Sequence, residues 1–147
     1  MTESPLDRFR DLPRDAAGRV TLSAAQWQAR LSPAQFHILR EGGTEPAGTG
    51  ALTDHDAPGE YHCAGCGLHL YSSDCKFHSA CGWPSFDDEV PNAVVRLEDR
   101  SFGRVRTEIR CRACDGHLGH VFHGEGMTAK DTRHCVNSAS ILFVPRA

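Results

Sequence analysis

Four of the seven cysteines in this chain form two Cys-x-x-Cys pairs, Cys63 with Cys66 and Cys111 with Cys114. Two thiolates separated by two residues can bind one ion, and two such pairs complete a tetrahedral four-sulfur site of the kind that holds zinc. A glycine follows each pair within two residues and allows the chain to turn back. The ion would join distant parts of the chain, so its binding would contribute directly to folding.

Four protein sulfurs leave no open position on the metal for water or substrate, so the sequence predicts a structural zinc clip formed by these four cysteines. The alternative is two unrelated redox pairs. A redox dithiol normally begins a helix in a βαβ unit, and that context is absent here. Sulfur ligands alone do not distinguish zinc from iron, so the identity of the ion stays open.

The length of 147 residues and the ordinary composition indicate one domain with a hydrophobic core. Residues 1–20 are rich in Asp, Arg and Pro and show little apolar periodicity, so we expect a flexible N-terminal arm there. Residues 21–147 are then expected to form the single folded domain.

Charge and hydropathy argue against several classes of function. The formal net charge is -3, whereas a nucleic-acid-binding surface normally shows clustered Lys and Arg. No run approaches the roughly 18 apolar residues of a membrane span, and the opening residues lack an apolar signal core. We therefore expect a monomeric cytoplasmic protein that binds neither nucleic acid nor membrane. In that reducing compartment cysteines serve metal binding and redox chemistry rather than structural disulfides.

Two short helices are expected after residue 22. Ser23 and Ser32 each begin an S-x-x-Q pattern, which is typical of a capping box, and Pro33 occupies the first position of the second helix. The sequence Glu-Gly-Gly at residues 41–43 ends that helix. Residues 44–58 are rich in Gly, Pro, Thr and Asp and indicate a loop.

The rest of the chain favours β-strands. Residues 104–111 alternate, with Val105, Thr107, Ile109 and Cys111 on one side and charged residues on the other, which predicts a half-buried antiparallel strand. Residues 93–99 and 134–144 are further strand candidates. Because helices do not alternate with these strands, a parallel nucleotide-binding sheet is not expected.

Cys135 stands apart from the paired cysteines, in a segment that reads as a strand. Side chains repeat every two residues along a strand, so Arg133, Cys135 and Asn137 share one face. A nearby positive charge favours the thiolate, which is the nucleophilic form. The alternative for Cys135 is a small buried apolar residue. His134 points the other way and is expected to pack or to face solvent.

Two further segments carry candidate site residues. His117 and His120 are three residues apart, and Gly119 between them favours a bulge that would place both on one side as proton donors. Trp83 precedes a proline and is therefore held in an extended conformation. Its indole can serve as core or as an apolar wall for a small methyl group, with Cys81 on the same side.

Taken together, these segments resemble the peptide-methionine (R)-S-oxide reductases, the methionine sulfoxide reductase B family. Four motifs carry the resemblance over about residues 23–143: CAGC at 63–66, GWPSF at 82–86, RTEIRCRACDGHLGHVF at 106–122 and RHCVNSAS at 133–140. The resemblance implies a mainly β fold of two antiparallel sheets, with short N-terminal helices and a four-cysteine zinc clip.

The resemblance also implies the thiol-dependent reduction of methionine (R)-S-oxide in oxidised proteins. Cys135 would be the nucleophile and form a sulfenic acid, and Cys81 would then form a disulfide with it that thioredoxin reduces. His120, helped by His117, would protonate the sulfoxide oxygen, because the sulfur is a poor electrophile without that proton. The substrate-binding residues would be Trp83, Phe122, Asn137 and Arg133.

Some positions depart from the family pattern. His134 replaces a usual tyrosine and Arg104 a frequent methionine, so we expect an altered rim of the substrate pocket. Cys75 stands where the family more often has threonine or serine; we expect it to be idle, and a second resolving thiol is the alternative. Two rival functions stay open: a zinc-ribbon binding module without chemistry, which leaves Cys81 and Cys135 unexplained, and a thiol peroxidase that uses the same cysteine pair.

Overall fold

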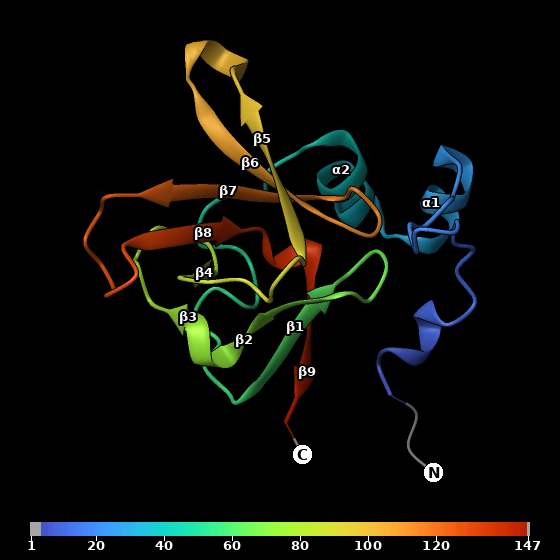
Figure 1. Ribbon diagram of the computed structural model, residues 1–147, viewed down its shortest axis with the longest axis horizontal. Helices are drawn as coiled ribbons and strands as arrows, with labels where there is room; N and C mark the ends of the chain where they lie inside the picture. Colours follow the sequence, from blue (N-terminus) through green and yellow to red (C-terminus); the bar gives the residue numbers. More distant parts are fainter. Residues whose placement is uncertain (1–3, 147) are drawn as a thin grey trace.

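The computed structural model describes residues 4–146, and over this range two α-helices precede nine strands (Figure 1). The helices are α1 (Ala24–Arg30) and α2 (Pro33–Glu41). The strands are β1 (Gly59–Cys63), β2 (His69–Ser72), β3 (Lys76–Phe77), β4 (Ser85–Phe86), β5 (Val94–Asp99), β6 (Arg106–Cys111), β7 (His117–His123), β8 (Thr132–Val136) and β9 (Ile141–Pro145).

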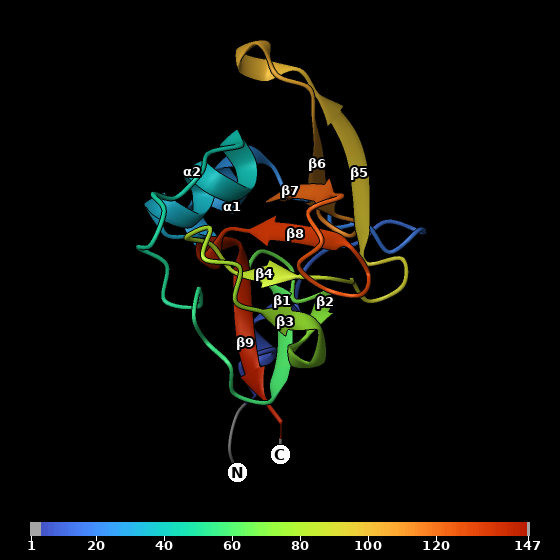
Figure 2. The same ribbon diagram turned by 90° about the vertical axis from the view of Figure 1, so that its left-hand side faces the viewer.

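The strands form two antiparallel sheets. The smaller sheet has the order β2-β1-β9, and the larger has the order β3-β4-β8-β7-β6-β5. The hairpin of β5 and β6 projects away from the body of the protein, and α2 packs against β7 beside the larger sheet (Figures 1 and 2). The predicted mainly β fold of two antiparallel sheets with short N-terminal helices is confirmed.

Both helices begin as the sequence predicts. Ser23 Oγ accepts a hydrogen bond from the Gln26 amide at 3.2 Å, and Ser32 Oγ accepts one from the Gln35 amide at 3.2 Å. Each glutamine side chain reaches back to the serine amide, which completes a capping box. Gly42 ends α2 in the left-handed conformation, with φ of 73°. Within residues 4–146, no helix is long and apolar enough to cross a membrane.

The prediction of a single strand over residues 134–144 is wrong, because this segment belongs to both sheets. β8 ends at Val136, a 3₁₀ turn follows at Ser138–Ser140, and β9 then continues in the smaller sheet. The Ser140 amide donates to the Asn137 carbonyl at 3.0 Å, which closes the turn. Asn and Ser favour such turns, but apolar residues on both sides hide the break in the sequence.

The alternation predicted for residues 104–111 holds for the second half of that segment. Ile109 and Cys111 are buried, but β6 begins only at Arg106, and Val105 is 65% exposed. Val105 precedes the strand, in the tip of the projecting β5–β6 hairpin (Figure 1). Its apolar side chain therefore has no core to face.

His134 belongs to an aromatic cluster that joins the larger sheet to the smaller one. Its Nδ1 lies 2.9 Å from the hydroxyl of Tyr71, whose ring stacks on Phe86 with centroids 4.3 Å apart. The His134 side chain is fully buried, and this burial lowers the pKa of His134 to about 4. Of the two environments expected for His134, packing is the correct one.

Residues 9–20 contact the region of the four paired cysteines. Phe9 and Leu12 are buried, and the Val20 amide donates to the Ala113 carbonyl at 2.8 Å. Arg14 also reaches the Cys66 carbonyl, at 3.4 Å. The flexibility of this arm and the division of the chain at residue 20 stay predictions, and residues 1–3 of the arm lie outside the described residues.

The bulge predicted near Gly119 is present in β7. Ile109 of β6 pairs with Gly119, but the next residue, Arg110, pairs with His117, so Leu118 is an extra residue. The extra residue places His117 and His120 on one side, with ring centroids 5.6 Å apart.

Gly119 also lies close to the Cys135 backbone of β8, so we predict that Gly119→Ala is strongly destabilising. A Cβ at this position would overlap the backbone carbonyl oxygen of Cys135, and the two strands would have to separate. The free energy of unfolding, measured by urea denaturation, should fall by at least about 2 kcal/mol. Gly65→Ala is the matched control, because its Cβ would come no closer than 3.4 Å to Trp27. Equal stability of the two variants would contradict this prediction.

Candidate functional site

The four paired cysteines form one compact cluster. Cys63, Cys66, Cys111 and Cys114 are buried, and their sulfur atoms all lie within 4.8 Å of one another. The closest cross-pair separations between Sγ atoms are 3.5 and 3.6 Å. Ligands about 2.3 Å from a tetrahedral ion lie about 3.8 Å apart, so the sulfurs are spaced to hold a single metal ion.

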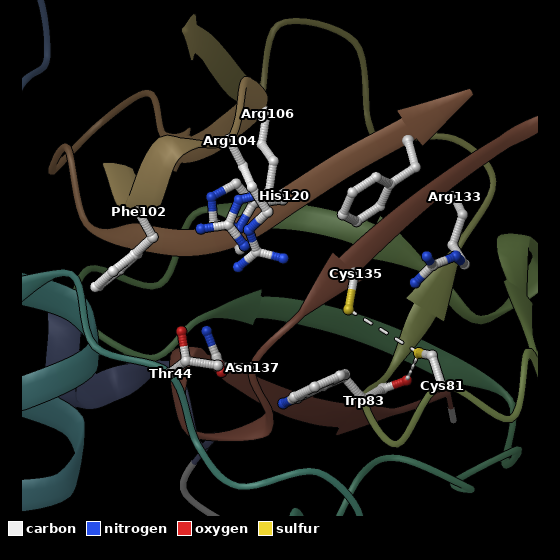
Figure 3. A pocket seen from close by; sticks show the side chains of 12 residues that line it. Thr44, Cys81, Trp83, Phe102, Arg104, Arg106, His120, Arg133, Cys135 and Asn137 are labelled. Atoms are coloured by element: carbon white, nitrogen blue, oxygen red, sulfur yellow. Dashed lines mark hydrogen bonds between the residues drawn. The ribbon is translucent and has the colours of Figure 1, made fainter. Parts of the chain in front are cut away.

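A separate cavity of about 440 Å³ opens beside β7 and β8 (Figure 3). It is lined by Thr44, Cys81, Trp83, Phe102, Arg104, Arg106, Gly119, His120, Phe122, Arg133, Cys135 and Asn137. Seven of the eight residues predicted to act on or bind substrate are in this lining, and His117 is the exception. The side chains come from segments far apart in the sequence, which the larger sheet brings together.

Cys135 and Cys81 face each other across this cavity, with their Sγ atoms 4.0 Å apart (Figure 3). Pairing of β4 with β8 sets this separation, because Ser85 lies directly opposite Cys135. Ser85 Oγ in turn lies 3.5 Å from the Cys81 sulfur. Cys135 is only partly buried and belongs to the lining of the cavity.

The pKa values of the two thiols are shifted in opposite directions. Burial raises the pKa of Cys135 to about 12, with a further contribution from the charge of Cys81, and Arg133 offsets only part of this rise. At Cys81 burial acts in the same direction, but hydrogen bonds from Ser79 and Ser85 outweigh it and lower the pKa. The burial and the neighbouring Cys81 charge thus oppose the low pKa expected for Cys135, and the shift at Cys81 favours the thiolate there.

Arg133 has less effect on Cys135 than the sequence suggests because its charge is already paired. Its guanidinium contacts the carboxylate of Glu125 through two hydrogen bonds, of 2.8 and 3.1 Å. The same group lies over the ring of Phe122, 4.7 Å from the centroid. Glu125 and Phe122 thus hold Arg133 at the edge of the cavity, and the carboxylate of Glu125 partly neutralises the charge of Arg133.

His120 is the histidine that lines the cavity. Its Nε2 donates to Asp99 Oδ2 at 2.8 Å, and Arg106 Nη2 contacts the same oxygen at 3.4 Å. Burial lowers the pKa of His120 from its ordinary value, and the nearby Arg106 charge adds to this effect. The hydrogen bond to Asp99 opposes the shift without cancelling it.

His117 lies behind His120 rather than in the cavity lining. Its Nδ1 is 2.6 Å from Glu108 Oε2, and its side chain is buried against α2. The predicted wall of two proton donors is therefore only partly formed. His117 contacts the ring of His120, and only His120 faces the cavity.

Glu45 is a residue of this site that the sequence did not indicate. Its backbone carbonyl accepts from Trp83 Nε1 at 2.9 Å, and its amide donates to Asn137 Oδ1 at 3.0 Å. Its carboxylate accepts from the Ala139 amide at 3.0 Å. These partners lie 38 to 94 residues away in the sequence, so only the folded chain reveals them.

The tip of the β5–β6 hairpin forms one rim of the cavity. Phe102 and Arg104 line it, and Phe102 is 89% exposed with a left-handed backbone φ of 57°. The expectation of an altered rim stays a prediction for Arg104, which does line the cavity. It is wrong for His134, which lies in the core beneath the sheet and does not reach the cavity.

Comparison with known proteins places the chain in a family. The SelR domain matches residues 31–145. "Peptide methionine sulfoxide reductase B3, chloroplastic" of Oryza sativa subsp. japonica is 54% identical over 129 residues, which cover 87% of this chain and 56% of that protein. "Peptide methionine sulfoxide reductase B3" of Arabidopsis thaliana is 51% identical over 90% of this chain and 74% of its own length.

A bacterial relative matches over nearly its whole length. "Peptide methionine sulfoxide reductase MsrB" of Synechococcus sp. (strain RCC307) is 50% identical over 139 residues, which are 94% of this chain and 97% of that protein. The chain spans just over half of the rice protein but almost all of the bacterial one. It belongs to the SelR domain family of peptide methionine sulfoxide reductases B, the family of oxidoreductases that its sequence predicts.

Proposed function

We propose that this protein reduces methionine (R)-S-oxide in oxidised proteins to methionine, with Cys135 and Cys81 as its reacting thiols. The observation that carries the proposal is the pair of sulfurs 4.0 Å apart, in a cavity that also holds His120 and Trp83. A nucleophile, a resolving thiol and a proton donor are the groups that sulfoxide reduction requires. The preference for the R epimer is part of this proposal and is supported by the family resemblance.

The first step begins from a pair of thiols that carries one negative charge. The proton on Cys135 passes to the Cys81 thiolate, and the Cys135 thiolate that results attacks the sulfoxide sulfur. His120 in its protonated form donates a proton to the oxygen. Burial makes this imidazolium a stronger acid, because it lowers the pKa. The oxygen then moves to the Cys135 sulfur, which becomes a sulfenic acid. The sulfur–oxygen bond of the substrate and the transient bond between the two sulfurs both break, and methionine leaves.

The second step converts the sulfenic acid on Cys135 into a disulfide. Cys81 loses its proton and attacks the Cys135 sulfur, and the hydroxide released takes up that proton to form water. The two thiols have then supplied the two electrons that reduced the substrate. The Sγ atoms need to approach from 4.0 Å to about 2.05 Å, which is a small movement for a loop residue such as Cys81. We propose thioredoxin as the dithiol that reduces this disulfide.

Trp83 and the rim residues would position the substrate. The indole of Trp83 is fixed by its hydrogen bond to Glu45 and offers an apolar surface to the S-methyl group. Asn137 and Arg133 would contact polar parts of the substrate, and Phe122 would complete the wall. The exposed Phe102 at the hairpin tip would contact the polypeptide around the oxidised residue, which favours protein-bound over free methionine sulfoxide.

We propose that the ion held by the four paired cysteines is zinc and that it is structural. Four thiolates fill the coordination sphere, so the ion would stabilise the two turns that carry them. His117 is proposed to support His120 by contact. A monomeric state and a cytoplasmic location stay predictions, and the relatives include chloroplastic proteins.

Substitution of the two cysteines should separate their roles. Cys135→Ser should abolish methionine release, because a serine hydroxyl is a far weaker nucleophile than a thiolate. Cys81→Ser should release one methionine per chain and then stop, because no disulfide partner remains. Methionine is quantified after mixing reduced protein with the (R)-sulfoxide, and disulfides are mapped by mass spectrometry.

Cys75→Ser is the matched control and should turn over like the parent protein. Loss of the first turnover in Cys81→Ser would contradict the role given to Cys81. Consumption of hydrogen peroxide in preference to the sulfoxide would indicate a thiol peroxidase instead.

The order of ionisation predicts how alkylation depends on pH. A thiol whose pKa is raised stays protonated to higher pH, so in the reduced protein Cys81 should be labelled by iodoacetamide at lower pH than Cys135. In Cys81→Ser the like charge is gone, and labelling of Cys135 should shift to lower pH. Labelled peptides are quantified by mass spectrometry at each pH. An unchanged pH dependence in that variant, or earlier labelling of Cys135 in the parent, would refute the assignment.

Removal of one ligand tests the metal assignment. Cys114→Ser should lose the ion and more than about 3 kcal/mol of the free energy of unfolding, because metal binding contributes to folding. Elemental analysis should find one zinc per chain in the parent and in the Cys75→Ser control. Iron in the parent, or full zinc content in Cys114→Ser, would show that the assignment is wrong.

A further inference from the structure

A second group of metal-binding side chains lies on the smaller sheet. Glu60 and His62 are two residues apart on β1 and share one face, and His69 on β2 is the cross-strand partner of His62. One donor atom from each of the three side chains lies within 4.8 Å of the others. We propose that Glu60, His62 and His69 bind a divalent transition-metal ion, separate from the one at the paired cysteines.

The hydrogen bond made by one ring nitrogen of His62 prepares the other for metal binding. His62 Nδ1 lies 2.8 Å from the Gly67 carbonyl oxygen. A carbonyl only accepts, so Nδ1 carries the hydrogen, and in the neutral ring Nε2 presents a lone pair. A backbone carbonyl on the second nitrogen is the usual support of a metal-binding histidine.

The lone pair of His62 faces a second acceptor. His62 Nε2 lies 2.9 Å from Glu60 Oε1, and both atoms carry electron pairs when the ring is neutral. Only a proton or a cation between them makes this contact favourable. Neighbouring ligands about 2.1 Å from a six-coordinate ion lie about 3 Å apart, so the observed separation suits two ligands of the same ion.

His69 completes the donor set. Its ring stacks on that of His62, with centroids 4.9 Å apart and planes inclined by 20°. Its Nε2 is buried and makes no hydrogen bond within the part of the chain that the structure describes. A buried polar atom without a hydrogen-bond partner destabilises the folded state. Coordination of His69 Nε2 to a metal ion would supply the missing interaction.

The donors indicate which ions would bind. Two imidazoles and one carboxylate suit zinc, nickel or copper, whereas magnesium and calcium prefer oxygen ligands alone. The side chain of His62 is only 7% exposed, but that of Glu60 is 48% exposed, so an ion can enter from solvent beside Glu60. Water would fill the remaining positions.

The position of this site predicts its effect on the fold. β1 ends at Cys63, and the turn between β1 and β2 contains Cys66, so an ion bound here would connect both strands at the base of that turn. Side chains alternate along β1, and Cys63 therefore points to the opposite face of the strand from His62. The two ions would stabilise one hairpin from its two faces.

Titration of the zinc-loaded protein with Ni²⁺ tests the proposal without reference to enzymatic activity. Calorimetry should detect one Ni²⁺ per chain in the parent protein, and paramagnetic broadening should be centred on amide signals of β1 and β2. His69→Ala and Glu60→Gln should each weaken this binding by at least tenfold. His37→Ala is the matched control, because His37 is an exposed histidine on α2 whose side chain is 63% exposed.

A loss of Ni²⁺ binding in His69→Ala and Glu60→Gln but not in His37→Ala supports the site. Equal affinity in all four proteins, or broadening centred on β8 near Cys135, would overturn the proposal. Because Glu60→Gln leaves both rings in place, it separates loss of a ligand from disturbance of the hairpin. Circular dichroism of each variant before titration confirms that the sheet is intact.

Discussion

The geometry of the candidate active site depends on the pairing of β8 with its two neighbours. Cys135 lies directly opposite His120 on β7 and directly opposite Ser85 on β4. A shift of register by one residue on either side would turn the thiol to the other face of the sheet. The close contact at Gly119, where any side chain would meet the Cys135 carbonyl, requires a glycine in this register. The position of the Cys135 sulfur is thus a property of the sheet.

Local signals in the sequence predicted most of the fold. The serine capping boxes and Gly42 act within a few residues, so the helices could be placed from the sequence alone. The bulge before Gly119 was predicted from a glycine between two histidines. The turn at Ser138–Ser140 was missed, because apolar residues continue on both sides and the change of sheet is a long-range property.

The residues of the site were predictable from motifs, but their electrostatics were not. The sequence places Arg133 two residues from Cys135, which suggests a stabilised thiolate. In the folded protein Glu125 pairs with that arginine, and burial outweighs the remaining charge. The partners of the histidines, Asp99 and Glu108, come from other strands. Such contacts depend on which strands become neighbours, and no spacing in one segment reveals them.

Glu45 shows how the site is organised before any ligand arrives. Its backbone forms hydrogen bonds with the indole of Trp83 and with the side-chain amide of Asn137. Its carboxylate accepts a hydrogen bond from the turn after β8. Side chains that lose their rotational freedom during folding need not lose it again on association. The entropic cost of orienting these groups is therefore incurred during folding. The side chains of Trp83 and Asn137 are already held in place when a ligand enters the cavity.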